Sequence, residues 1–192
     1  TLQEMPPRAM ERAMGLHGLL IWKKANGIDD SPVQPYREQK SMSTEHTFET
    51  DTIDIKMVRV ILSAMTEKLA YKLRRSGRLT GCISVKIRYA DFDTVSKQLS
   101  IPYTANDAKL MEIVYRLFDQ LYQRRVLIRL IGVRLSELVR GSYQISLFED
   151  TPEQISLYQA MDKIRNRFGS TAVQRAITLG AAFREYDSNG SA

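Results

Sequence analysis

Hydrophobic and polar residues alternate along several stretches of the chain, and a period of two is typical of strands that bury one face. In residues 40–49, Met42 and Phe48 share one parity, and mostly small hydroxyl side chains occupy the other. Residues 82–89 and 95–101 alternate in the same way, with an Ala-Asp-Phe-Asp-Thr turn between them. We therefore expect one strand, followed later by a hairpin of two strands.

A fourth strand is predicted by the apolar and β-branched run between Arg124 and Gly141. Two other stretches place apolar residues on one side of a helix. The first begins at the capping sequence Asp51-Thr52-Ile53-Asp54, and the second begins at Asn106 or Asp107. The two apolar sides consist of Val58, Ile61, Leu62, Met65, Leu69 and Leu73, and of Leu110, Ile113, Val114, Leu117, Phe118 and Leu121.

The predicted order is β-α-β-β-α-β, which is an α+β fold. Each element has one apolar side, so two helices must cover one face of a four-stranded, largely antiparallel sheet. The other face gathers hydroxyl and basic side chains without aromatic residues. Such a face is suited to hydrogen-bonding phosphates and poorly suited to stacking on bases, which argues against an RNA-recognition module of the same topology. By parity, this face carries Ser41, Ser43, Lys86, Arg88, Ser96, Ser100, Arg134 and Ser136.

Less regular segments flank this predicted domain, which spans residues 40–141. Residues 1–27 read as short helices joined by a Gly-Leu-His-Gly turn, which is either a plain turn or a place where free helical N–H groups meet a phosphate. We interpret them as the end of a larger domain, and residues 28–39 as an extended linker. Residues 151–192 are predicted to form a helical tail, in which a second short helix runs to about Leu179. The first tail helix is expected to pack through Leu157, Met161, Ile164 and Phe168.

The positive charge of the chain is concentrated in the predicted domain. The 192 residues are 43% hydrophobic and 26% charged, as in globular proteins, with a formal net charge of +6. Residues 40–141 hold 18 basic and 11 acidic residues, a net +7, whereas the preceding segment holds 5 of each and the following one 5 against 6. This distribution predicts a polyanionic partner such as nucleic acid, with a basic surface that binds nothing as the alternative.

Cysteine usage and hydropathy bear on the compartment. The chain has a single cysteine, Cys82, which excludes an internal disulfide and fits a reducing environment. Neither a signal peptide nor an apolar run of membrane-spanning length is evident in the sequence. We therefore expect a soluble, cytoplasmic protein without a membrane partner.

A short apolar motif follows the predicted fourth strand. Residues 142–150 contain Gln144-Ile145-Ser146-Leu147-Phe148 and then two acids. An exposed Leu-Phe pair in such surroundings indicates a partner that covers it. The motif nearly repeats as QISLY at residues 154–158, but a capped helix contains that copy, so we expect only the first to be free for binding.

Three motifs together resemble the C-terminal part of Y-family translesion DNA polymerases of the DinB or DNA polymerase IV type. They are NGIDDSPVQPYREQKSMSTEHTF, RLIGVRLSEL and QISLF. The resemblance covers nearly the whole chain. It implies that residues 1–27 are the latter part of a thumb, residues 40–141 a little finger, and residues 142–192 a bacterial tail. It also implies that the sheet of the little finger lies against the backbone of primer–template DNA.

The resemblance implies roles for particular residues in the little finger. The family's Lys-Ser-x-Ser appears as Lys40-Ser41-Met42-Ser43, and its Gly-Val-Arg-x-Ser as residues 132–136. Both would contact DNA. Some relatives carry a second arginine two places before that glycine, where this chain has Leu130. Parity directs the neighbouring Arg129 away from the DNA face unless a bulge shifts the register.

The motif that follows the little finger also has a counterpart in the family. QISLF resembles the pentapeptide by which bacterial polymerases bind the sliding clamp. Leu147 and Phe148 would enter an apolar groove there, while Gln144 would make polar contacts. A random apolar pentapeptide in a loop is the alternative. The implied partners are therefore primer–template DNA and the bacterial sliding clamp.

The resemblance assigns catalysis to another part of the parent enzyme. Nucleotidyl transfer uses carboxylates that hold two metal ions, and in this family the palm supplies them for magnesium. The acids of this chain are dispersed through caps and turns. We therefore expect this part of a DNA-directed DNA polymerase to bind DNA without catalysis and without a cofactor of its own. The alternative is a protein-interaction module that docks a partner, or a second copy, through the sheet or the thumb helices.

Overall fold

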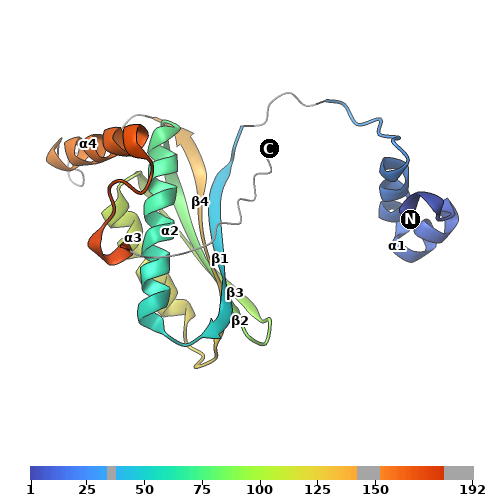
Figure 1. Cartoon of the computed structure of the whole chain (residues 1–192), viewed down its shortest axis with the longest axis horizontal. Coiled ribbons are helices and arrows are strands. Elements are labelled where there is room, and N and C mark those ends of the chain that lie inside the picture. Colours follow the sequence, from blue (N-terminus) through green and yellow to red (C-terminus); the bar gives the residue numbers. More distant parts are fainter. Residues whose placement is uncertain (34–37, 142–151, 180–192) are drawn as a thin grey trace. The chain divides into compact units, whose positions relative to one another are not determined.

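A computed structural model describes residues 1–33, 38–141 and 152–179 of the chain. The chain divides into two compact units, Thr1–Glu38 and Gln39–Ala192 (Figure 1). Within the described ranges, none of the helices has the length and apolar character needed to span a membrane.

The first unit consists of a short 3-10 helix, η1 (Leu2–Glu4), and a kinked helix, α1 (Pro7–Ala25). The kink lies at Gly15, whose φ of 62° and ψ of −153° are outside the helical range. The helical segment after the kink approaches the one before it closely, because a Cβ atom on Gly18 would clash with the carbonyl oxygen of Met10. The Gly-Leu-His-Gly sequence therefore allows both the turn and the close approach.

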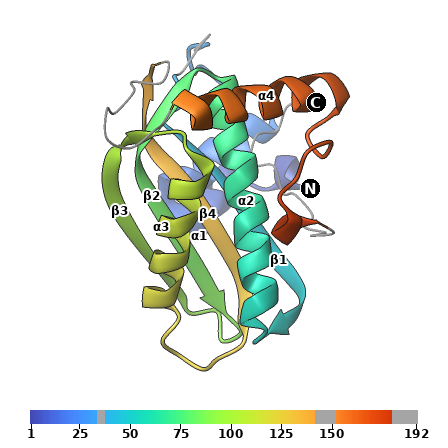
Figure 2. The ribbon, with the colours of Figure 1, turned by 90° about the vertical axis from the view of Figure 1, so that its left-hand side faces the viewer.

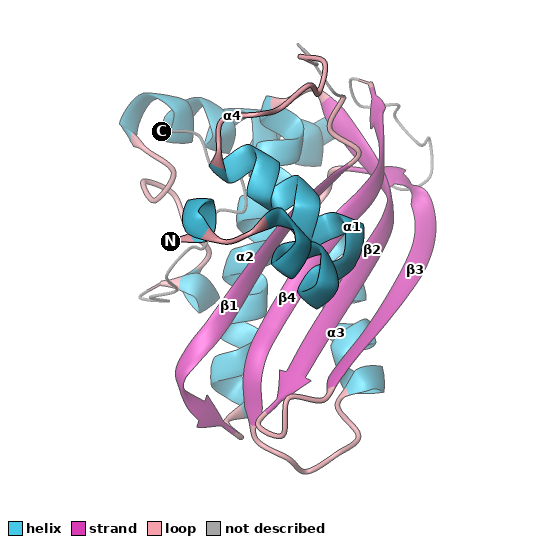
Figure 3. Ribbon diagram, turned by 90° about the vertical axis from the view of Figure 1, so that its right-hand side faces the viewer, coloured by secondary structure: helices cyan, strands magenta, loops and turns pink. Residues whose placement is uncertain are grey.

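The second unit has the predicted β-α-β-β-α-β order and is an α+β fold, which confirms the sequence prediction. Its four strands form one sheet in the order β1-β4-β2-β3, and all three pairings are antiparallel (Figure 3). The six elements are β1 (Ser41–Thr52), α2 (Ile55–Arg75), β2 (Arg78–Tyr89), β3 (Thr94–Thr104), α3 (Asp107–Leu121) and β4 (Ile128–Arg140).

Helices α2 and α3 lie side by side on one face of the sheet, where the hydrophobic core forms (Figure 2). The carboxylate of Asp54 accepts hydrogen bonds from the first turn of α2, and Asn106 caps α3 in the same way, as the sequence predicts. Leu62, Ile83 and Val114 are fully buried between the layers. Burying each such side chain contributes about 1.5–3 kcal/mol, so the apolar side of each element determines this layered arrangement.

Two further elements, α4 (Pro152–Phe168) and the short 3-10 helix η2 (Ala176–Thr178), pack on the outer side of the helices (Figure 2). The predicted packing side of α4 is wrong. Leu157, Ile164 and Phe168 are exposed, whereas Tyr158 is only 5% exposed. The predicted second tail helix is reduced to η2.

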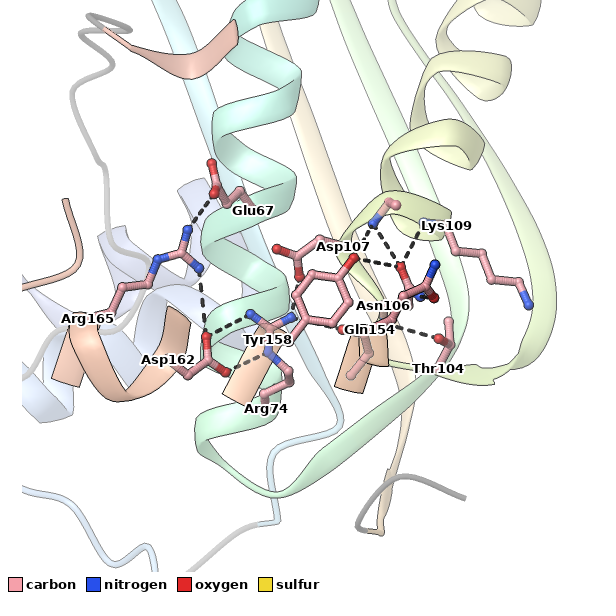
Figure 4. A network of polar contacts seen from close by, with 12 residues as sticks. Glu67, Arg74, Thr104, Asn106, Asp107, Lys109, Gln154, Tyr158, Asp162 and Arg165 are labelled. Atoms are coloured by element: carbon pink, nitrogen blue, oxygen red, sulfur yellow. Dashed lines mark hydrogen bonds and ion pairs between the residues drawn. The ribbon is translucent and has the colours of Figure 1, made fainter. Parts of the chain in front are cut away.

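The buried side of α4 is polar because it joins a group of charged residues, which we call the helix-layer ion network (Figure 4). The Nε atom of Arg74 lies 2.7 Å from Asp162 Oδ2, and the same guanidinium contacts Asp107 at the start of α3. Arg165 pairs with Glu67 and also donates to the carbonyl oxygen of Val173. The network consists of Glu67, Arg74, Asp107, Asp162 and Arg165.

Surrounding contacts complete this network. The guanidinium of Arg74 lies over the ring of Tyr158, 5.0 Å from its centroid, and the Tyr158 hydroxyl reaches Asn106 at the cap of α3. Thr178 of η2 donates to the second carboxylate oxygen of Glu67 over 3.1 Å. Burial lowers the pKa of Arg74, but the hydrogen bonds and negative charges of Asp162 and Asp107 outweigh burial and raise this pKa above its ordinary value. The C-terminal segment is thus attached to the helices by ion pairs rather than by an apolar stripe.

Candidate nucleic-acid interface

The sheet face opposite α2 and α3, which we call the open face, has four rows of side chains. Because the register of all three strand pairs is regular over this region, residues of matching parity stand next to one another across four strands. From one end of the sheet to the other, the rows are Ser41, Ser136, Cys82 and Ser100; Ser43, Arg134, Ser84 and Gln98; Glu45, Gly132, Lys86 and Ser96; and Thr47, Leu130, Arg88 and Thr94.

The structure brings together the residues that the sequence predicted for DNA contact. Eight of the nine belong to these rows, and Lys40 immediately precedes β1. Lys40, Ser43, Ser96, Ser100 and Arg134 are exposed. The half-buried members are Ser41, Lys86, Arg88 and Ser136.

The second row has the strongest set of free donors. Arg134 is exposed and makes no ion pair with any other residue in the described part of the chain. Its cross-strand neighbours are Ser43 on β1 and Ser84 on β2. A guanidinium flanked by two hydroxyl groups matches the hydrogen-bonding requirements of a phosphate.

The third row is different because it contains an acid. The Nζ atom of Lys86 forms an ion pair with Glu45, reaching across the position of Gly132. A Cβ atom at Gly132 would lie 3.1 Å from Glu45 Cγ and 3.5 Å from Lys86 Cε. The missing side chain at this position therefore leaves the space in which the pair forms.

A hollow of about 220 Å³ opens around this pair. Hydroxyl groups from three strands border it, and Arg134 and Lys86 supply its positive charge. Its lining residues are Ser43, Glu45, Ser84, Lys86, Ser96, Gly132, Val133 and Arg134. The hollow is thus a place on the open face that could receive an anionic group.

The fourth row contains Leu130, which has the open-face register between Thr47 and Arg88. Beyond it the register shifts: Leu130 pairs with Arg88, but Ile128 pairs with Tyr89, so Arg129 occupies a bulge. The Arg129 guanidinium lies 4.6 Å from the centroid of the Phe92 ring and 3.7 Å from Asp51. Strand parity therefore does not determine the direction of Arg129.

The predicted contact residues do not include every member of the rows. Alternation along the sequence directs Ser84 outward with Lys86 and Arg88, and Gln98 outward with Ser96 and Ser100, but neither is among the residues predicted to contact DNA. Thr94 accepts a hydrogen bond from Arg88 over 2.9 Å, a contact that alternation could not predict. The ion pair of Glu45 was also missed, because it depends on how strands distant in sequence align.

The predicted clamp-binding residues Gln144, Leu147 and Phe148 lie outside the residues that the structure describes. Within the described ranges, no three His, Cys, Asp or Glu side chains come close enough to hold a metal ion. The acids of those ranges are thus not arranged to hold the magnesium ions that the family resemblance implies for the parent enzyme.

Comparison with known proteins agrees with the motifs. Residues 39–147 match the impB/mucB/samB family C-terminal domain. DNA polymerase IV of Clostridium acetobutylicum is 35% identical over 170 residues, which cover 85% of this chain and 42% of the relative. DNA polymerase IV 2 of Bacillus subtilis is 32% identical over 194 residues, covering 97% of this chain and 47% of the relative. The chain thus spans less than half the length of these relatives.

Solved structures give a weaker likeness. One of them is the crystal structure of DinB from Sulfolobus solfataricus, which is 19% identical with a TM-score of 0.47. The aligned region covers 73% of this chain and 41% of the DinB chain. The family match does not depend on this likeness, because it spans more than half of the sequence. The chain therefore belongs to the impB/mucB/samB family and contains its C-terminal domain, as the DinB-type motifs indicated.

Proposed function

We propose that residues 40–141 are the DNA-binding little finger of an error-prone translesion DNA polymerase and that they bind primer–template DNA through the open face. The observation that carries the proposal is the set of four aligned rows, in which hydroxyl and basic side chains from all four strands share one surface. The names of the relatives, DNA polymerase IV, support a DNA substrate for the parent protein.

The chemistry of the rows favours the sugar–phosphate backbone over the bases. Hydroxyl groups and cations bind phosphate oxygens without reading sequence. None of the four rows includes an aromatic residue on which a base could stack. Binding of this type suits a polymerase domain that must hold DNA of any sequence.

Replacing Arg134 by alanine tests the proposal. With a fluorescein-labelled primer–template duplex, anisotropy should show an affinity that falls steeply as salt rises, and Arg134→Ala should reduce the slope of log K against log salt by about one. Arg116→Ala is the matched control, because Arg116 is an exposed arginine on α3, in the helical layer. Binding that ignores salt, or equal effects of the two variants, would contradict the proposal.

We further propose that the parent enzyme is tethered to a bacterial sliding clamp by Gln144, Leu147 and Phe148. The sequence QISLF supports this role. Leu147→Ala with Phe148→Ala should abolish capture of a purified clamp while leaving DNA affinity unchanged. Leu157→Ala is the control from the near-copy of the motif, since Leu157 is 56% exposed on α4 and its removal leaves the core intact. Retained capture by the double variant would assign the clamp contact to another segment.

Nucleotide incorporation and its magnesium ions belong, in this proposal, to a part of the parent enzyme other than the described residues. A metal-dependent incorporation assay on the chain tests this assignment directly. Measurable incorporation by the chain alone would overturn it.

The second candidate is an interaction module for protein partners. It is supported by apolar side chains that α1 exposes, notably Met14, Leu16 and Leu20, of which Leu16 is 76% exposed. Light scattering over a concentration range separates the two candidates. Association that strengthens with concentration and is lost in Leu16→Ser with Leu20→Ser would favour the interaction module, whereas a monomer at all concentrations would remove its support.

A further inference from the structure

The Glu45–Lys86 ion pair is the feature of the open face that the proposed function does not explain. Glu45 is the only acid among the sixteen residues of the four rows, and it stands beside a lysine that the proposal assigns to DNA. A carboxylate repels phosphate, so its position in the middle of the face opposes DNA binding.

The local geometry makes the pair possible. β4 separates β1 from β2, so a bulky side chain at position 132 would stand between Glu45 and Lys86. Because Gly132 has no side chain, the side chains of Glu45 and Lys86 can meet across β4. The Cγ atom of Glu45 lies 3.1 Å from the position that a Cβ atom of residue 132 would occupy. The two side chains of the pair therefore line the same hollow as Ser43, Ser84 and Ser96.

The pair is also exposed enough to exchange partners. The side chains of Lys86 and Glu45 are 32% and 42% exposed. Ion pairs in such surroundings are weak and are screened by salt. A DNA backbone concentrates negative charge along its length, so a phosphate entering the hollow competes effectively for the lysine ammonium group.

We infer that Glu45 is an internal competitor for the phosphate: it holds Lys86 in the unbound protein, and a backbone phosphate must displace it from Lys86 when DNA binds in the hollow. This inference rests on the proposed function and adds that Glu45 limits the affinity for DNA. Each binding event breaks the Glu45–Lys86 pair and leaves a carboxylate next to DNA. The affinity of the open face for DNA is therefore lower than it would be without Glu45, which suits a domain that must release the duplex and move along it.

Substituting Glu45 by glutamine tests the inference, because glutamine keeps the shape and removes the charge. Titration of the full chain with the labelled primer–template duplex should show about three- to tenfold tighter binding at low salt. The salt slope should steepen by up to about one, since Lys86 then releases a counterion of its own. Glu112→Gln is the matched control, because it makes the same charge change at an exposed position on α3.

The same substitution made in a Lys86→Gln protein determines whether Glu45 acts through Lys86. If Glu45 acts through Lys86, the gain from Glu45→Gln should be clearly smaller in a Lys86→Gln protein. A gain of equal size in that background would overturn the inference, because Glu45 would then act on the DNA alone. An equal gain from Glu112→Gln would overturn it as well, because net charge would then explain the effect.

The result also separates this inference from the proposed function. Failure of the unsubstituted chain to bind the duplex would overturn both. Normal, salt-dependent binding that Glu45→Gln leaves unchanged or weakens would overturn only the competitor role. Thermal unfolding of each variant, followed by circular dichroism, checks that the compared proteins are equally folded.

Discussion

The helix-layer ion network and the open face both pair basic side chains with carboxylates, but the pairs of the network are buried and the pair on the open face is partly exposed to solvent. In the helix-layer ion network, the side chains of Arg74 and Asp107 are 4% and 0% exposed. On the open face, Lys86 and Glu45 are 32% and 42% exposed. A buried charge that loses its partner cannot be rescued by water, whereas an exposed one can. The same chemistry therefore fixes one part of the molecule and leaves the other available for exchange.

This difference agrees with the structural role of the network and with the function proposed for the open face. The helix-layer ion network attaches α4 and η2 to the helices that cover the sheet, so its ion pairs must persist in the folded protein. The open face is proposed to bind a polyanion, which requires cations that change partners. Exposure rather than residue type separates the pairs that hold the fold together from the pair that is proposed to exchange partners.

The largest expected effect comes from Arg74→Met. This substitution removes the ion-pair partner of the buried Asp107 and leaves Asp162 with only Arg165, 3.8 Å away, so the free energy of unfolding should fall by about 3–5 kcal/mol. Arg59→Met is the matched control: Arg59 also links α2 to an aspartate of α3, at 2.7 Å from Asp119, but its side chain is 42% exposed. It should cost at most about 1 kcal/mol. Urea unfolding of the two variants measures both values, and equal losses would break the comparison.

A smaller loss is expected from Arg165→Met. Glu67 would lose its ion pair but keep the hydrogen bond from Thr178, so we expect the free energy of unfolding to fall by about 2–3 kcal/mol. Adding Glu67→Met should restore part of the loss, because the buried charge is then removed together with its partner. Urea unfolding checks the order. A double variant less stable than Arg165→Met would show that Glu67 has a role beyond this pair.

The smallest effect is expected at an exposed pair near the end of the sheet. The backbone N–H of Asp93 and then the guanidinium of Arg124 lower the pKa of Asp91. Because this pKa is lowered in the folded state, the stabilisation is present above the ordinary aspartate pKa and is lost as pH falls below it. Asp91→Asn should therefore lower the unfolding temperature slightly at neutral pH, and the difference should shrink and then vanish as pH falls through the lowered pKa of Asp91.

Thermal unfolding over a pH series measures this trend. Glu112→Gln serves as the control, since it removes an exposed acid from the helical layer. A deficit of Asp91→Asn that stays constant down to pH 2 would assign the effect to packing rather than to charge.

Local pattern identified the elements of the second unit because each rule involves neighbours in sequence. Spacing alone predicted a cap within residues 51–54, a cap at Asn106 or Asp107, and the buried helix sides, and the structure identifies Asp54 and Asn106 as the caps. The side on which α4 packs was not. Its apolar residues suggested an apolar contact, but the partners of Asp162 and Arg165 lie on α2, far away in sequence.

The open face shows the same division. Parity identified the predicted DNA-contact residues in its rows, and it also directed Leu130 correctly to this face. It could not determine the direction of Arg129, because a bulge in β4 interrupts the alternation. Nor could it find the pair between Glu45 and Lys86, which depends on the order of β1, β4 and β2 in the sheet.

The sequence by itself thus determined the fold class, the family and the chemical character of the open face, because periodicity, caps and motifs are local properties of the chain. The tertiary structure decided which charges are buried, which carboxylate faces which cation, and where the register shifts. These depend on contacts between segments distant in sequence, and the free energy of a charge depends on how far those contacts exclude water.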